Sequence, residues 1–337
     1  MLNFDEDRFV ESQIGAVSCA GALHEVIAER LSNGADNLFF AGAGGAGILM
    51  WPAQELLARR SGFMTFTERP AELVAGGSVH LGARSIVVIP SRSGDTAESL
   101  EVVKYAKGFG ASIITFTGTP DSLLAREADV NFTNPVADDN SSESFYLQSL
   151  LLALAVMDVR GEVDGHDDLV DELRLLPPLL LEAKRSFEDQ AVQMADDIAA
   201  APYHIITGAG STWPEAFYYG MCILEEMQWI RTRPVHAADF FHGPLELVEP
   251  GVSCLLVKGE DWSRPLVDRV EQFVRTYSDQ LMLLDTTTVA MPGISDRTRA
   301  LISPILLATL LERVSAHLEV KRNHPLTTRR YYRAVAY

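Results

Sequence analysis

The sequence predicts two tandem α/β domains, each built on a doubly wound parallel sheet. Its 337 residues exceed one ordinary domain and suit two. Short strands of continuous apolar and β-branched residues alternate with helical stretches, which is typical of buried parallel strands. The pattern of the first half recurs in the second half, so we expect two copies of one unit.

Three predicted strands of the first half have counterparts in the second half. The first strand of each copy runs into Gly-Ala-Gly, and each copy is preceded by a helical segment, at 11–31 and 183–200. The paired strand segments are Asn37 to Gly47 with Tyr203 to Thr212, Ser85 to Pro90 with Val252 to Val257, and Ser112 to Phe116 with Gln280 to Leu284. We interpret this correspondence as a duplication.

The boundary between the copies is expected near Asp158 to Leu180. There the acidic run Glu162 to Glu172 gives way to Leu-Pro-Pro-Leu at 176–179. We therefore predict an N-terminal domain over residues 1–165 and a C-terminal domain over residues 166–337.

Composition excludes several classes of protein. The net charge of −18 argues against nucleic acid, whose phosphates require basic surfaces. The acidic start, Met1 to Arg8, does not have a signal peptide's pattern, and Ile305 to Leu311 is too short to span a membrane. The three cysteines are far apart in the sequence, without paired spacing, so we expect free thiols in a reducing cytoplasm. We expect a cytoplasmic protein that uses no metal and no cofactor.

A hydroxyl-rich loop follows the predicted strand that ends at Pro90. Ser91, Ser93 and Thr96 surround Gly94, and a helix begins directly after them. Ligands bind beyond the carboxyl ends of parallel strands, where helix N-termini offer free N–H groups to anions. A helix cap by Ser93 or Thr96 is the alternative, but it explains only one hydroxyl. The loop therefore predicts a phosphate site.

A second glycine-rich turn leaves nucleotide binding open. Gly42 to Gly47 spells the dinucleotide pattern G-x-G-x-x-G, and Glu68 stands near the position of a ribose-binding acid. Against this reading, the second copy keeps Gly-Ala-Gly without the third glycine. That difference favours a shared structural turn.

The densest candidate chemistry lies between Ile223 and Glu249. Glu225 and Glu226 come late in a helix that starts near Pro214, and neighbouring side chains point about 100° apart on a helix. Apolar residues directly after them are expected to raise the pKa of a carboxylate toward that of a general base. His242 lies in Phe-Phe-His-Gly-Pro, which can hold an imidazole rigidly, whereas His236 is expected to be structural.

The loop S-x-S-G-x-T-x-E resembles the phosphosugar-binding signature of the sugar-isomerase (SIS) domain family. The resemblance implies a flavodoxin-like fold and phosphate contacts from Ser91, Arg92, Ser93 and Thr96. The second copy has Lys-Gly-Glu-Asp at 258–261, so only the first domain is expected to hold phosphate.

Two further first-domain positions match the family. Gly45 stands where many members carry a phosphate-binding serine, and here it can offer only its backbone N–H. Ser141 matches a serine that contacts the sugar, although a helix cap explains its segment equally well.

The catalytic segment is similar to the isomerase half of glucosamine-fructose-6-phosphate synthase. It is more similar to the fructoselysine-6-phosphate deglycases, which share its helix end, Phe-Phe-His-Gly-Pro and the tail Arg329 to Tyr331. In these families a Glu sixteen residues before the histidine moves a proton between C1 and C2, which selects Glu226. His242 then serves ring opening, with Asp239 orienting it.

The resemblance also implies an activity. The synthase has a lysine in place of Glu225 and another in its tail, which here contains none, so the deglycases are the better match. We expect an enzyme that splits a 6-phosphorylated fructosamine into a hexose 6-phosphate and a free amine. An amino-sugar-phosphate deaminase and an aldose–ketose isomerase remain alternatives, and a non-catalytic phosphosugar sensor is a weaker one. The families further imply a homodimer or higher homo-oligomer.

Overall fold

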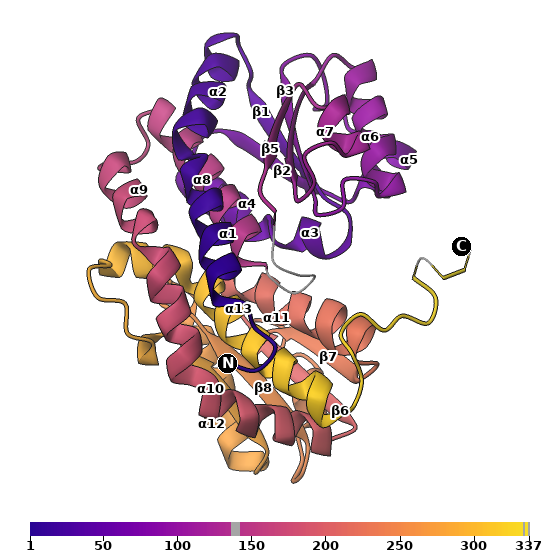
Figure 1. Cartoon of the computed structure of the whole chain (residues 1–337), viewed down its shortest axis with the longest axis vertical. Helices are drawn as coiled ribbons and strands as arrows, with labels where there is room; N and C mark the ends of the chain where they lie inside the picture. Colours follow the sequence, from indigo (N-terminus) through magenta and orange to yellow (C-terminus); the bar gives the residue numbers. More distant parts are fainter. Residues whose placement is uncertain (136–141, 333, 336–337) are drawn as a thin grey trace. The chain divides into compact units, whose positions relative to one another are not determined.

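The computed structural model describes residues 1–135, 142–332, 334 and 335 (Figure 1). The chain divides into two compact units. Of the described residues, those between Asp7 and Pro177 form the N-terminal unit, and residues 1–6 together with the chain from Pro178 onward form the C-terminal unit. Ser141, a predicted sugar contact, lies outside the described residues.

The N-terminal unit is built on a five-stranded parallel sheet in the order β2-β1-β3-β4-β5, which is the flavodoxin-like order. Its strands are β1 (Asn37–Ala41), β2 (Met64–Glu68), β3 (Ser85–Ser91), β4 (Ser112–Thr117) and β5 (Val130–Thr133). Its helices are α1 (Glu6–Ser18), α2 (Ala20–Ser32), α3 (Gly44–Ile48), α4 (Trp51–Arg60), α5 (Pro70–Gly76), α6 (Ala97–Gly108), α7 (Leu123–Glu127), α8 (Glu143–Val159) and α9 (His166–Arg174).

Helices cover both faces of this sheet, which explains the continuous apolar strands. β1 and β3 are buried at every position. Phe39 and Val87 pack with Val102 of α6 on the face that α5, α6 and α7 cover (Figure 1). On the other side α2 and α4 pack against α8, whose interior is buried all round.

The C-terminal unit repeats the first four positions of that topology with the order β7-β6-β8-β9, again parallel. Its strands are β6 (Tyr203–Gly208), β7 (Arg231–His236), β8 (Ser253–Lys258) and β9 (Leu281–Asp285). Its helices are α10 (Leu176–Ala200), α11 (Trp213–Tyr218), a π-helix (Tyr219–Met227), α12 (Arg264–Tyr277), α13 (Asp296–Lys321) and the short 3₁₀ turns Gly210–Thr212, Pro244–Leu247 and Thr286–Thr288. The prediction of two parallel α/β domains is confirmed.

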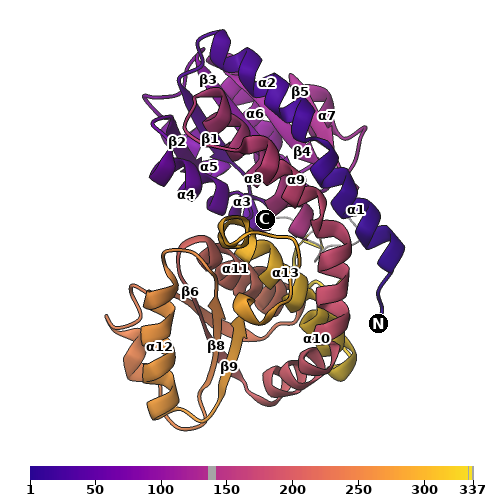
Figure 2. The same ribbon diagram turned by 90° about the vertical axis from the view of Figure 1, so that its left-hand side faces the viewer.

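The two faces of this second sheet carry different helices. Ile205 of β6 packs with Val270 of α12 on one face. A Cβ atom on Gly220 of the π-helix would lie 3.3 Å from Ile206 Cδ1, which places the π-helix on the other face with α11 and α13. Figure 2 shows α12 on one side of β8, with α11 and α13 on the opposite side.

Helix α13 is the central helix of this unit. Its 26 residues are long and apolar enough to cross a membrane by composition alone, but 89% of the apolar window is buried inside the protein. The uninterrupted apolar run from Ile305 to Leu311 is much shorter than the apolar window of this helix, so the run alone gave too short an apolar length. Buried ion pairs join it to α10, between Lys184 and Glu312 and between Arg313 and Glu188. It is therefore a core helix that carries paired charges.

Candidate active site

The hydroxyl-rich loop joins β3 to α6. Ser91 is the last residue of β3 and is buried, and its Oγ accepts a hydrogen bond from Gly94 N at 3.0 Å. Thr96 is the N-cap residue of α6, but its hydroxyl makes no capping bond and lies 3.4 Å from Ser91 Oγ. The helix-cap alternative is therefore wrong for Thr96. The first N–H groups of α6 are not satisfied by this side chain.

Gly94 sets the shape of this loop. Its φ is +65°, and a Cβ atom there would collide with the Ser122 hydroxyl at the start of α7. Its carbonyl accepts a bond from Leu124 N at 2.9 Å, and the carbonyl of Arg92 accepts one from Gly118 N at 3.0 Å. Two hydrogen bonds from the β4–α7 segment thus hold the backbone of the loop in place.

The exposed side of the loop carries Arg92, Ser93 and Asp95. The Ser93 hydroxyl donates to the Asp95 carboxylate, and the Arg92 side chain faces solvent. A bound phosphate would compete with Asp95 for the Ser93 hydroxyl. Arg92 supplies a local positive charge in a strongly acidic protein.

The glycine turn after β1 contacts this loop. A Cβ atom on Gly42 would lie 2.8 Å from Gly47 N and 2.9 Å from Pro90 Cγ, directly before Ser91. Gly45 is in the first turn of α3, where backbone N–H groups have no partner within the helix. The structure therefore brings Gly45 and Ser91 to adjoining turns at the carboxyl edge of the sheet.

Backbone packing also explains why the glycines of this turn are needed. Gly44 has a φ of +54°, and Gly210 in the C-terminal unit has a φ of +53°. A Cβ atom on Gly208 would lie 2.9 Å from Thr212 O, and one on Gly42 would lie 2.8 Å from Gly47 N, so neither turn has room for a side chain. Both units make the same turn, which supports the structural reading over a nucleotide site.

Glu225 and Glu226 lie in the π-helix that continues α11. π-Helices are rare in proteins, and many of those that occur are at functional sites. Glu225 Oε1 accepts a hydrogen bond from Thr232 Oγ1 at 2.7 Å, whereas Glu226 Oε1 forms an ion pair with Arg329 Nε at 2.9 Å. The two neighbouring carboxylates therefore have different partners, β7 for one and the C-terminal tail for the other.

The expected apolar surroundings of Glu226 are absent among the described residues. Its side chain is 39% exposed and faces a guanidinium. Met227 and Ile230 are buried in the core, so they do not line the carboxylate. The expectation is wrong for Met227 and Ile230, because these side chains pack inward while both glutamates are exposed; Trp229 is partly exposed.

The C-terminal tail is fastened to the end of this π-helix. Trp229, two residues after the last residue of the helix, has a φ of +56°, a strained value for a residue with a bulky side chain. The Arg330 guanidinium lies 3.8 Å from the centre of the Trp229 ring, and the His324 ring lies 4.5 Å from it. Gln228 Nε2 donates to His324 O at 2.7 Å. These contacts hold Arg329 beside Glu226.

The contact between Arg329 and Glu226 is not apparent from the sequence. In the sequence, Arg329 to Tyr331 only match the tail of the deglycases, and no role at the site follows from that match. An exposed Trp229 and two consecutive arginines were the available signals for a cation–π contact.

His242 lies on a loop that aromatic side chains anchor. Phe240 is fully buried against α12, and Arg269 lies over the Phe241 ring at 4.0 Å. Gly243 follows with a φ of +128°, and the imidazole is exposed. The aromatic side chains therefore anchor this loop, and rigid holding of the imidazole stays a prediction.

Asp239 and His236, two residues near His242 in the sequence, make different hydrogen bonds. Asp239 accepts a bond from His242 N at 2.9 Å through its backbone carbonyl. The expected orienting role of the Asp239 carboxylate remains a prediction. His236 Nδ1 accepts a bond from Ala238 N at 3.1 Å, which is the structural role expected for it.

Glu226 and His242 are on segments that pack on opposite faces of the sheet. The π-helix is on the face of Ile206, and Phe240 packs with Ile205 and α12 on the other face. Strand β7, at the sheet edge, separates them in the chain. The segments that carry the two predicted catalytic groups therefore pack on opposite faces of one sheet.

Comparison with known proteins connects the chain to a family. The model of the SIS domain matches residues 33–158, which contain the hydroxyl-rich loop. Fructosamine deglycase FrlB of Bacillus subtilis (strain 168) is 30% identical over 90% of this chain and 93% of its own length. Fructoselysine 6-phosphate deglycase of Escherichia coli O157:H7 is 25% identical over 92% of this chain and 89% of its own.

A solved structure has the same fold. A protein of Salmonella typhimurium LT2, provisionally described as a phosphosugar isomerase, superposes with a TM-score of 0.88 at 28% identity. The match covers 96% of this chain and 97% of that chain. The likeness therefore includes both units.

Replacing Gly94 by alanine is expected to destabilise the N-terminal unit. A non-glycine residue in a left-handed conformation costs about 1–2 kcal/mol, and the new methyl group would displace Ser122 from the start of α7. Urea denaturation should show a lower midpoint. Gly108→Ala is the control, because Gly108 ends α6 with open space around it. Equal midpoints for the two variants would contradict this account of the loop.

Proposed function

We propose that this chain, which belongs to the SIS-domain family, is a deglycase of a 6-phosphorylated fructosamine. Its products would be a hexose 6-phosphate and a free amine. The observation that carries the proposal is the hydroxyl-rich loop at a helix N-terminus, in a chain that matches fructosamine deglycase FrlB over 93% of that protein. The proposed enzyme is cytoplasmic and hydrolytic.

The N-terminal unit would bind the phosphate. Ser91, Ser93 and Thr96 offer hydroxyls, Arg92 offers a charge, and the first N–H groups of α6 point toward the same edge. Gly45 N–H would add a donor from the adjoining turn, and Ser141 a contact to the sugar. These local donors can hold an anion in a protein with a net charge of −18.

The C-terminal unit would move the proton. Glu226 removes a proton from C1 of the open-chain ketoamine while the C2 oxygen gains one, which gives an enaminol. Glu226 then returns its proton to C2, and the nitrogen loses a proton, which leaves an imine at C1. Water adds to that imine, and the C1–N bond then breaks to release the amine and the aldehyde sugar. His242 would transfer the proton that opens the sugar ring.

Arg329 would orient the carboxylate of Glu226 during this transfer. The ion pair places a guanidinium beside one oxygen of that carboxylate, and the tail that carries Arg329 is anchored on Trp229 through Arg330. The nearby Glu225 is bonded to Thr232 and would take no part.

We further propose that the active enzyme is a homodimer, or a higher homo-oligomer, whose sites combine residues of two tandem-repeat chains. Glu226 and His242 lie on segments that cover opposite faces of one sheet. A symmetric dimer can bring the Glu226 face of one chain to the His242 loop of the other.

Loss of the loop hydroxyls should weaken binding of the phosphorylated substrate. In a Ser91→Ala, Ser93→Ala protein each lost charge-assisted bond costs about 1.5–3 kcal/mol, so KM should rise at least ~10-fold. The ratio of KM values for phosphorylated and unphosphorylated fructosamines isolates the phosphate contribution. Ser18→Ala with Ser32→Ala, two exposed helix serines of the same unit, is the matched control. An unchanged ratio would remove the loop from the site.

Glu226→Gln should lower turnover at least ~100-fold, because it keeps the shape of the side chain but removes the base. KM should change little, since the phosphate contacts are elsewhere. The measurement is amine release from a panel of phosphorylated fructosamines. Glu225→Gln is the matched control and should stay near wild type. An inactive Glu225→Gln protein together with an active Glu226→Gln protein would show that Glu225, and not Glu226, is the base. Sugar isomerisation without amine release would indicate the isomerase alternative.

A mixed dimer tests whether two chains share a site. Glu226→Gln and His242→Ala chains carrying different affinity tags are co-expressed, and the species with both tags is isolated. If each site takes one group from each chain, one site is intact and turnover should be about half of wild type. Two separately purified mutant homodimers, each nearly inactive, are the controls. An inactive mixed dimer, or a fully active monomer, would contradict the arrangement.

A further inference from the structure

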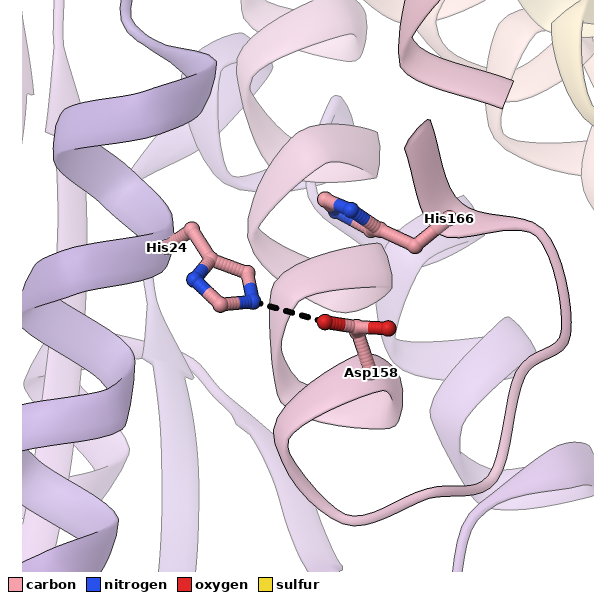
Figure 3. A group of neighbouring side chains, drawn as sticks. All are labelled: His24, Asp158 and His166. Carbon is pink, nitrogen blue, oxygen red and sulfur yellow. Dashed lines mark hydrogen bonds and ion pairs between the residues drawn. The ribbon is translucent and has the colours of Figure 1, made fainter. Parts of the chain in front are cut away.

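Three potential metal ligands from distant parts of the sequence meet in the N-terminal unit. They are His24 of α2, Asp158 of α8 and His166, the first residue of α9 (Figure 3). His24 Nε2 lies 2.8 Å from Asp158 Oδ2, and the two imidazole rings are 5.1 Å apart between centres. One ligand atom from each residue lies within 4.8 Å of the other two.

The cluster is built into the fold. Gly165, with a φ of +62°, turns the chain so that α9 begins with His166 beside the other two residues. α2 packs along α8, which keeps His24 next to Asp158. The side chains are 32%, 34% and 13% exposed for His24, Asp158 and His166, so the group is half-buried and still reachable from solvent.

We propose that His24, Asp158 and His166 bind a zinc ion. Two imidazole nitrogens and one carboxylate oxygen are ligands that Zn²⁺ prefers, with bonds of about 2.0–2.2 Å. Atoms bound to one such ion lie roughly 3–4 Å apart, so small side-chain rotations bring these three into range. Water from the exposed side completes a tetrahedral set.

A neighbouring carboxylate supports the orientation of one ligand. Asp167 Oδ1 lies 3.3 Å from His166 Nδ1. Metal-binding histidines commonly donate their second ring N–H to such a group, which fixes the ring and raises its basicity. Asp167 therefore leaves the other ring nitrogen of His166 for the ion.

The site would fasten the start of α9 to α2 and α8. Without an ion, the His24–Asp158 hydrogen bond joins only α2 and α8, and His166 is not needed for it. Bound zinc adds α9 to the junction and stabilises the folded unit. This departs from the expectation of no metal, which rested on ligand spacing along the sequence.

The test uses the full-length, tag-free protein after chelator treatment and dialysis. Zn²⁺ alone is titrated by calorimetry, and we expect one strong site per chain. Removing even an outer hydrogen-bond partner costs about 10–100-fold in metal affinity, so His166→Ala should weaken zinc binding at least ~10-fold. Asp158→Asn keeps a hydrogen-bond acceptor for His24 but is a poor ligand, and it should weaken binding similarly. His80→Ala, an exposed histidine of the same unit, is the matched control.

Spectroscopy and stability distinguish a zinc site from a structural hydrogen bond. Co²⁺ in the same site should show the intense visible absorption of a four-coordinate ion, absent from the His166→Ala protein. Zn²⁺ should raise the Tm of the wild type and of His80→Ala, but not of His166→Ala. Circular dichroism verifies that each variant is folded, and His166→Gln replaces any variant that is not. Equal zinc affinity in wild type and His166 variants, or no stoichiometric binding to the wild type, would overturn the proposal.

Discussion

The turns at the carboxyl ends of the strands leave no room for a Cβ atom, and the candidate sites depend on this constraint. Gly42 packs against the backbone of Gly47, Gly94 against Ser122, and Gly208 against Thr212 O. Each turn delivers a helix or a 3₁₀ turn directly to the edge of its sheet. Backbone donors and short hydroxyl side chains thereby collect where an anionic group can approach.

The C-terminal unit uses a different device to present its chemistry. A π-helix continues an α-helix, and Trp229, two residues after its end, has a left-handed conformation. The tail offsets this strain through Arg330, which lies over the Trp229 ring, and His324, which meets that ring edge-on. The same tail places Arg329 against Glu226, so the local strain and the position of the candidate base have one structural cause.

An edge strand separates the predicted catalytic groups. The apolar alternation along β6 sends Ile205 and Ile206 to opposite faces, and the segments with His242 and Glu226 follow these faces. This separation of the two segments is the observation on which the proposal of a shared site between two chains rests.

The sequence by itself determined the fold class, because buried parallel strands and glycine turns are local patterns repeated along the chain. It also located the Ser91 to Thr96 loop, since strand, hydroxyls and helix are consecutive. Only the tertiary structure decided that Arg329 faces Glu226, that Glu226 is exposed rather than enclosed, and that His24 meets Asp158 and His166. Arg329 and Glu226 are more than a hundred positions apart in the sequence, and so are His24 and Asp158. Packing between helices brings them together, and no local period or motif encodes it.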